Sequence, residues 1–317
     1  MAVSIIINQI VMLAIVVLIG VTASRFAIIT EVSRDFLAKI IFNISLPAMV
    51  LTNFMKIGVN DRLLSNSILF LFLSVVVLMF MLLAGRMTSG ILKLEKGQSG
   101  IFRIHSMLGN IIYLGFPVIS SLFGNEGLLY ASIFALVSNI LMWTVGVMTI
   151  SSAHEGSFIR GLRHVLNPNS IAVVAGFILF LFSVKLPKII LEPLNGLGAA
   201  NTFLSMLYIG AVIYYASIRK MAKTLSVYIL SLNKLLLVPL VVLAAFIFIN
   251  SLLTVKIDPL VISVLVLQSA MPCMVNVVLL VNYLGEDDSQ ATANVFFSTI
   301  LSIATLPLIL LSLRFLY

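Results

Sequence analysis

Long apolar runs separated by short polar breaks constrain the fold of this chain more than any other feature. The run from Ile257 to Leu284 is long enough by itself to cross a lipid bilayer, because a spanning helix needs about 20 apolar residues. Ten such runs occur, near residues 5–24, 36–56, 64–84, 101–123, 127–150, 169–185, 198–218, 225–250, 257–284 and 289–313. They are continuous rather than alternating, which disfavours a transmembrane β-barrel. We therefore predict an all-α polytopic membrane protein with ten transmembrane helices in a lipid bilayer.

The composition supports this prediction and excludes a soluble fold. Hydrophobic residues make up 61% of the 317 residues and charged residues only 9%, more apolar side chain than a soluble domain can bury. The net charge of +8 could indicate a nucleic-acid partner, but the basic residues are scattered over short loops, and we expect no such partner. The single cysteine, Cys273, excludes a disulfide framework, and we interpret it as a packing residue.

The distribution of Lys and Arg predicts the orientation. If both termini lie outside, the inner loops and their flanks carry 13 basic residues and the outer side carries 6. Lys234 is counted here as a residue that flanks an inner loop. Because inner loops are enriched in basic residues, we predict extracytoplasmic N- and C-termini and a cell-membrane location. The N-terminus has no basic residue before its first apolar run, so we interpret that run as the first span rather than a cleaved signal peptide.

The chain divides near its middle. The most polar connector follows the fifth apolar run, and Pro117 and Pro272 are 155 residues apart, close to half of the chain length. Five helices in each half make the halves run in opposite directions, which is the inverted-repeat arrangement of secondary transporters. We predict a first five-helix repeat at 1–150, a cytoplasmic connector at 151–168 and a second five-helix repeat at 169–317.

Helix-breaking residues lie inside the fourth and ninth runs, at corresponding places in the two halves. Proline removes a backbone hydrogen bond, and Pro117 is expected to free a carbonyl near Tyr113 and to break the helix there. The half-helix that follows such a break has an N-terminus that favours an anion. If the two broken segments cross near the midplane, they form a binding site for substrate. Its candidate residues are Asn110, Tyr113, Gly115 and Pro117 in the fourth run, and Gln268, Ser269, Pro272 and Asn276 in the ninth.

Polar residues in two further runs admit two interpretations. Asn43 in the second run is either part of the wall of a polar cavity or a partner for hydrogen bonds between helices at a proline kink. Ser138 and Asn139 in the fifth run either line the substrate path or bridge two helices. All three are retained as candidate substrate-binding residues.

The sequence lacks the residues that several kinds of transport or metal chemistry require. No Asp or Glu falls deep in a predicted span, and His105, His154 and His164 are interpreted as interfacial or loop residues. Metal-ligand spacing and a Walker A sequence are both missing, so we expect no metal site, no cofactor and no ATP-driven pump. A buried acid is the usual proton relay, so coupling to protons or to sodium stays open.

Four stretches together resemble the auxin efflux carrier superfamily, which includes plant PIN-FORMED carriers and bacterial malate and malonate permeases. They are NISLPAMVLTNF in the second run, GNIIYLGFPVISSLFGNEGLLYASIFALVSN across the fourth and fifth, QSAMPCMVNVVLLVNYLG in the ninth and FFSTILSIATLPLILL in the tenth. The resemblance covers nearly the whole chain.

This resemblance implies ten helices in two inverted repeats, similar to the bile-acid symporter and sodium/proton antiporter folds. It implies that the fourth and ninth helices cross in a transport domain, with Asn110, Pro117 and Pro272 at the crossing. Asn139 would line the substrate path, and Asn43 would lie on the facing wall. The first, second, sixth and seventh helices would form a scaffold through which such proteins can dimerise.

The leading hypothesis is a secondary transporter of small organic anions, mono- or dicarboxylates such as malate or malonate, and not an enzyme. One alternative is a carrier of auxin-like aromatic carboxylates, and a second is a membrane receptor that binds the same anions without moving them. A channel is disfavoured, because repeated broken helices are typical of a gated, alternating site.

Overall fold

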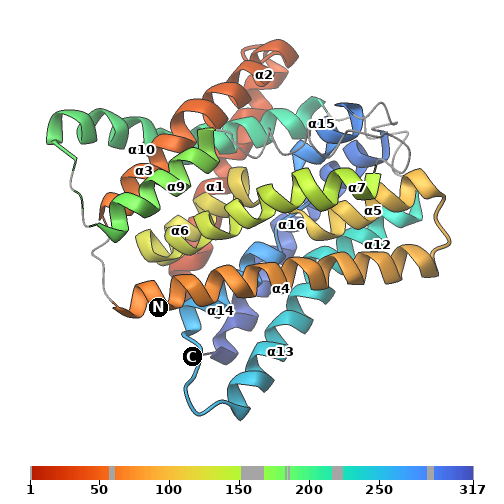
Figure 1. The fold of residues 1–317 in the computed structure, drawn as a ribbon. Coiled ribbons are helices and arrows are strands. Elements are labelled where there is room, and N and C mark those ends of the chain that lie inside the picture. Colours follow the sequence, from red (N-terminus) through yellow and green to blue (C-terminus); the bar gives the residue numbers. More distant parts are fainter. Residues whose placement is uncertain are drawn as a thin grey trace. The chain divides into compact units, whose positions relative to one another are not determined.

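The computed structural model describes residues 2–56, 61–150, 168–182, 184, 186–215, 224–283 and 289–316. This part of the chain is helical (Figure 1), and its extended pairing is limited to one isolated bridge between Gly109 and Cys273. The first half contains α1 (Ala2–Arg25), α2 (Glu31–Ile40), η1 (Ile41–Ser45), α3 (Leu46–Lys56), α4 (Asp61–Ile91), α5 (Lys96–Met107), η2 (Ile111–Gly115), α6 (Phe116–Leu141), η3 (Met142–Gly146) and α7 (Val147–Ile150). The second half contains α9 (Pro168–Leu181), α10 (Lys188–Tyr215), α12 (Leu225–Leu232), η4 (Asn233–Leu237), α13 (Val238–Leu252), α14 (Pro259–Ser269), α15 (Val275–Tyr283), α16 (Ser289–Ser312) and η5 (Leu313–Leu316).

Helix occurs within each of the ten predicted ranges, and six continuous helical segments are long and apolar enough to cross a membrane. These six are Glu31–Lys56, Asp61–Ile91, Ile111–Ile150, Lys188–Tyr215, Leu225–Leu252 and Ser289–Leu316. The multi-pass, all-helical prediction is thereby supported, whereas the ten-span inverted-repeat topology stays a prediction. The predicted connector at 151–168 lies outside the described residues except for Pro168, which begins α9.

Three of the four π-helical turns end two residues before a proline. They are η1 before Pro47, η2 before Pro117 and η4 before Pro239. A proline ring clashes with the carbonyl four residues earlier, and a wider π turn moves that carbonyl away. The helix therefore continues past these prolines.

The segment Phe116–Leu141 contains a sharp kink at Gly124, whose φ of 60° and ψ of −146° are not helical. This backbone conformation is open essentially to glycine alone. The kink falls between the predicted fourth and fifth helices, which end near 123 and begin near 127, so it marks the connection that the polar residues there predict.

The chain forms two compact units, and each takes segments from both halves of the sequence. Unit 1 comprises Met1–Phe70, Ile112–Leu136 and Leu166–Tyr215, and unit 2 comprises Leu71–Ile111, Val137–Val165 and Ala216–Tyr317. The helices that the resemblance assigns to a scaffold, here α1, α2, α3, α9 and α10, all belong to unit 1. Unit 1 also contains the start of α4, most of η2 and most of α6, so the scaffold assignment stays a prediction.

Unit 1 is held by close helix contacts and an aromatic cluster. Helix α1 packs on α10, where Gly20 and Gly210 bring the two backbones into contact, as small residues do between membrane helices. Helix α3 packs on α9 (Figure 1), and the Phe54 ring lies 6.3 Å from the rings of both Phe177 and Phe180, measured between centroids. These are edge-to-face and tilted contacts of the kind that aromatic rings prefer.

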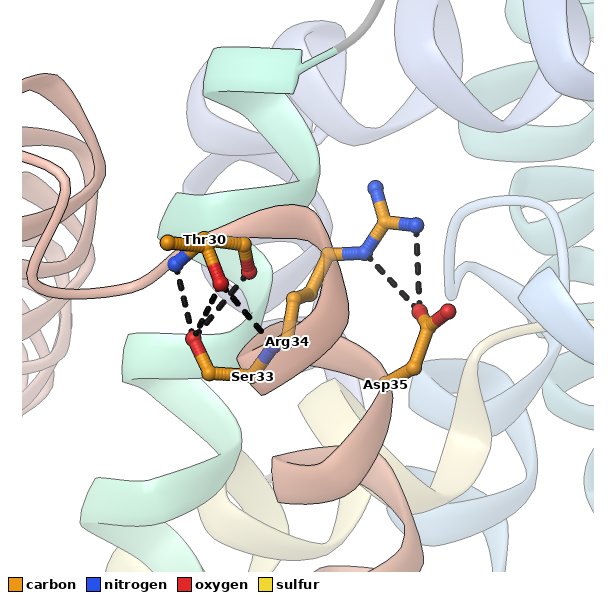
Figure 2. Close-up of polar contacts among 4 residues, drawn as sticks. All are labelled: Thr30, Ser33, Arg34 and Asp35. Atoms are coloured by element: carbon orange, nitrogen blue, oxygen red, sulfur yellow. Dashed lines mark hydrogen bonds and ion pairs between the residues drawn. The ribbon is translucent and has the colours of Figure 1, made fainter.

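The N-terminus of α2 in the same unit carries a complete capping box (Figure 2). The Ser33 amide donates to Thr30 Oγ1 at 3.2 Å, and the Thr30 amide donates to Ser33 Oγ at 2.7 Å. Two amides that a helix end leaves unpaired are satisfied in this way. Next to them, Arg34 donates to the Asp35 carboxylate at 3.1 Å and 3.2 Å in an exposed ion pair.

Candidate functional site

Two short non-helical segments cross inside unit 2. Leu108–Asn110 separates α5 from η2, and Ala270–Met274 separates α14 from α15. Gly109 pairs with Cys273 in an antiparallel bridge, and the Asn110 amide donates to the Pro272 carbonyl at 2.6 Å. We call these two segments the crossing. The predicted contact between the fourth and ninth apolar runs is therefore present in the fold.

Gly109 permits this crossing by its lack of a side chain. A Cβ at this position would lie 3.1 Å from both the Cβ and the carbonyl oxygen of Met271, which is tighter than most real contacts. A larger residue would require Met271 to shift by a few tenths of an ångström. The glycine thus allows the close approach of the two backbones.

The helix breaks agree with the sequence in one span and differ in the other. In the ninth run, α14 ends at Ser269 and α15 begins at Val275, so the break surrounds Pro272 as predicted. In the fourth run the break lies at Leu108–Asn110 rather than at Pro117, and the prediction of its place was wrong. The reason is that η2 absorbs the clash of Pro117, which stands as the second residue of α6.

The crossing contains the ends of two half-helices with opposite partial charges. Helix α5 ends at Met107 and α15 begins at Val275, so the last carbonyls of α5 and the first amides of α15 lack partners within their own helices. Just before α15, the Cys273 amide donates to Ser298 Oγ of α16 at 2.9 Å. The α15 end can attract an anion, and the α5 end a cation.

Lys234 supplies that cation. Its side chain is 1% exposed, and its ammonium Nζ donates to the Ser106 carbonyl in the last turn of α5 at 3.1 Å. The interpretation of Lys234 as a residue that flanks an inner loop was therefore wrong. It lies ten residues into the helical stretch that starts at Leu225, held by the π turn η4.

His105 is buried as well, with an exposed fraction of 0%. Its Nε2 lies 3.3 Å from the Met274 carbonyl at the crossing, and its Nδ1 lies 3.1 Å from Nδ2 of Asn294 on α16. The interfacial interpretation of His105 was therefore wrong, because the residue falls on the face of α5 that packs against α15 and α16. His154 and His164 lie outside the described residues.

We call His105, Ser106, Lys234, Asn294 and Ser298 the His–Lys cluster. Of these, only His105 and Lys234 were noted in the sequence, and neither was assigned to the site. One signal was present: Lys234 and Asn294 are polar residues well inside apolar runs, which is a costly place for them and often a functional one.

Three predicted residues of the ninth run lie next to the crossing in unit 2. Gln268 is 0% exposed, and neither its amide nitrogen nor its oxygen has a hydrogen-bond partner among the described residues. Ser269 Oγ donates to the Val266 carbonyl at 2.7 Å, within its own helix. Asn276 is partly buried and is the second residue of α15. Gln268 therefore keeps its full hydrogen-bonding capacity for a ligand.

The other predicted residues are divided between the units. In unit 2, Ser138 is buried and Asn139 is partly buried. In unit 1, Tyr113 is buried with its ring 5.0 Å from that of Tyr208, and Gly115 and Pro117 are buried beside it in sequence. Asn43 is exposed, and its amide donates to the Lys39 carbonyl of its own helix at 2.9 Å. Among the predicted site residues, Asn110 and Pro272 are thus a pair that the described structure joins by a hydrogen bond.

Comparison with known proteins identifies the family of this chain. The family model described as membrane transport protein matches residues 5–310. An uncharacterized transporter of Methanocaldococcus jannaschii is 29% identical over 208 residues, which is 62% of this chain and 65%, slightly less than two thirds, of that protein. A second uncharacterized transporter, from Methanothermobacter thermautotrophicus, is 25% identical over 304 residues, 93% of this chain and 94% of the relative. The chain therefore belongs to the membrane transport protein family, the auxin efflux carrier superfamily that its motifs resemble.

Proposed function

We propose that this membrane transporter is a secondary carrier of small organic anions, mono- or dicarboxylates such as malate or malonate. The anion would bind at the crossing in unit 2, and alternating access would carry it across the cell membrane. Asn110, Gln268 and Asn276 would hydrogen-bond its carboxylate oxygens. Ser138, Asn139 and Ser269 remain candidate substrate-binding residues in the same unit.

Buried Lys234 carries this proposal. Among the described residues, Lys234 has a backbone carbonyl as its partner and not a carboxylate, and no Asp or Glu is buried. An ammonium in a low-dielectric interior without a counter-ion is costly. A substrate carboxylate would supply the missing negative charge, which favours anions over cations and neutral solutes.

The helix end and the buried amides add selectivity. The first amides of α15 present partial positive charge to a carboxylate, and Gln268 offers both a donor and an acceptor. The hydroxyl group of a hydroxy acid such as malate would donate a hydrogen bond to the side-chain oxygen of Gln268. With few contacts, we expect affinities in the micromolar to millimolar range, about −8 to −4 kcal/mol.

The finer topology belongs to the same proposal. Ten spans in two inverted five-helix repeats, with both termini outside, would fit the distribution of Lys and Arg and the helix in each predicted range. Unit 1 would be the scaffold, and a homodimer would form through it. Tyr113, Gly115, Pro117 and Asn43 remain candidate substrate-binding residues within unit 1.

Counterflow in proteoliposomes tests the function. Purified protein is reconstituted, loaded with unlabelled malate, malonate, lactate or indole-3-acetate, and supplied with a trace of the same labelled compound. We expect exchange of at least one small carboxylate. In Asn110→Ala and Asn276→Ala, exchange should fall about tenfold or more, the loss that about 1.5–3 kcal/mol of charged hydrogen bonding corresponds to.

Asn201→Ala is the matched control, because Asn201 is a buried amide of unit 1 that was not assigned to the site. It should exchange at the wild-type rate for equal amounts of monodisperse protein. Saturable binding without exchange would identify a receptor instead, and exchange of indole-3-acetate alone would identify an aromatic carboxylate carrier. Normal exchange by both site variants would remove the crossing as the binding site.

A further inference from the structure

The hydrogen-bond partners of His105 in this arrangement fit a neutral ring. The Met274 carbonyl can only accept, so His105 Nε2 carries the hydrogen of that 3.3 Å contact. Nδ2 of Asn294 can only donate, so His105 Nδ1 accepts in the 3.1 Å contact. One ring nitrogen donates and the other accepts, which is the pattern of a neutral imidazole.

Asn294 also holds an unused acceptor beside this ring. Its Oδ1 is buried and has no hydrogen-bond partner among the described residues. A half-turn of the amide would exchange Nδ2 for Oδ1 opposite Nδ1 and would let the amide accept from a protonated imidazolium. Such a charge-assisted bond is stronger than the neutral one it would replace. The Asn294 side chain is thus able to serve both states of His105.

The charges around His105 are positive or neutral. Lys234 binds the carbonyl of the adjacent Ser106, and the Cys273 thiol lies 4.0 Å from the His105 carbonyl. On α5 itself Arg103 donates to Ser89 Oγ. Of the helices that pack on α5, the described residues of α7, α12, α15 and α16 carry no Asp, Glu, Lys, Arg or His. Helix α4 approaches Ser106 at Gly85 and carries Arg86 next to this contact. A proton on His105 would therefore be a second positive charge in the cluster, with no described carboxylate to balance it.

We propose that His105 is the proton-binding residue of the transport cycle and that it takes up one proton together with a dicarboxylate. This inference rests on the proposed function. In it, a proton from one aqueous compartment binds Nδ1 of His105 when the dianion enters the crossing, and both are released to the other compartment. Lys234 and the imidazolium carry two positive charges, which match the two negative charges of malate or malonate.

The coupling is reciprocal. If a dicarboxylate favours the imidazolium, the imidazolium favours the dicarboxylate by the same factor. His105 reaches the crossing through the Met274 carbonyl, directly before α15, so the proton and the anion act on the same half-helix end. A monocarboxylate such as lactate is balanced by Lys234 alone and needs no proton.

Proton uptake and exchange are measured together in proteoliposomes that contain a pH-sensitive dye. Downhill entry of labelled malate or malonate should move about one proton per anion in the wild type. In His105→Gln the ratio of protons to anions should fall toward zero, whatever rate remains. Asn294→Leu keeps the imidazole and removes the acceptor for Nδ1–H, and its ratio should fall as well. Asn201→Ala should keep the wild-type ratio.

The outcomes separate the two proposals. Counterflow by none of the carboxylates would overturn the proposed function and this inference with it. Downhill entry of a dicarboxylate without proton movement, or counterflow of lactate alone, would leave a carboxylate carrier and overturn the inference. If His105→Gln fails to fold, Asn294→Leu decides: an unchanged ratio of protons to dicarboxylate in that variant contradicts the role of His105.

Discussion

The interiors of the two units differ in charge. The polar side chains buried in unit 1 are neutral hydroxyls and amides such as Ser45, Asn53 and Asn201, and each of these has a partner within that unit. Unit 2 buries Lys234 and His105 among its described residues. Neutral hydrogen bonds hold helices together in a membrane, whereas buried charge is retained at a cost and marks function.

The two units also differ in what happens to a helix at a proline. In unit 1 the π turn η1 lets the helix pass Pro47 without interruption. In unit 2 the helix stops at Ser269, and the chain crosses another segment before it resumes at Val275. A proline alone therefore does not create a site. In the proposed site, a freed backbone end also meets charge, because Lys234 of the His–Lys cluster donates to the Ser106 carbonyl.

Removal of the buried charge should give the largest effect. In Lys234→Met we expect counterflow of malate or malonate to fall about tenfold or more, since a charge-assisted contact is worth about 1.5–3 kcal/mol. The free energy of unfolding should change by less than about 2 kcal/mol. Loss of the bond to Ser106 is offset by relief from burying an ammonium. Counterflow and thermal unfolding of the same preparations measure both quantities.

The control for Lys234→Met is Asn201→Leu in unit 1. It removes the 2.9 Å bond from Ser45 Oγ to Asn201 Oδ1 and leaves that hydroxyl with its 3.4 Å contact to the Ile41 carbonyl, which should cost about 0.5–1.5 kcal/mol of stability. Its transport per folded molecule should equal that of the wild type. The opposite pattern would be a less stable Lys234→Met with normal transport. It would show that Lys234 only stabilises the C-terminus of α5, and the charge difference between the units would then have no role in transport.

The sequence predicts parts of this fold for reasons that can be stated. Pro272 stands beside Ser269 and Cys273 in a stretch with no π turn, so the break falls where the proline predicts it. Pro117 is indistinguishable from it in sequence, yet η2 carries the helix past it, because a widened turn depends on the packing around the chain. Lys234 was missed for a similar reason: a count of basic residues by loop cannot separate a lysine at a helix end from one turned inward onto Ser106.

Gly109 offers a sharper test of the crossing, with a smaller expected effect. In Gly109→Ala the new methyl group meets Met271, and we expect a loss of about 1–3 kcal/mol in the free energy of unfolding together with slower counterflow. Gly90→Ala in α4 of the same unit is the matched control, since its Cβ would meet no atom within 4 Å. That variant should be neutral or gain up to about 1 kcal/mol from helix propensity. Equal stability of the two variants would mean that Met271 can shift away from the new methyl group at little cost in free energy.

The smallest effect is expected at the cap of α2. Thr30→Ala removes the side chain that accepts from the Ser33 amide, and we expect a loss of about 0.5–2 kcal/mol, measured by thermal unfolding. Thr30→Ser should keep most of the wild-type value because its hydroxyl can accept the same bond. Neither variant should alter the ratio of protons to dicarboxylate, since the buried polar side chains among the described residues of unit 1 are neutral. A changed ratio in Thr30→Ala at equal amounts of folded protein would show that unit 1 shares in the coupling, and the contrast between a neutral and a charged interior would then no longer locate the chemistry.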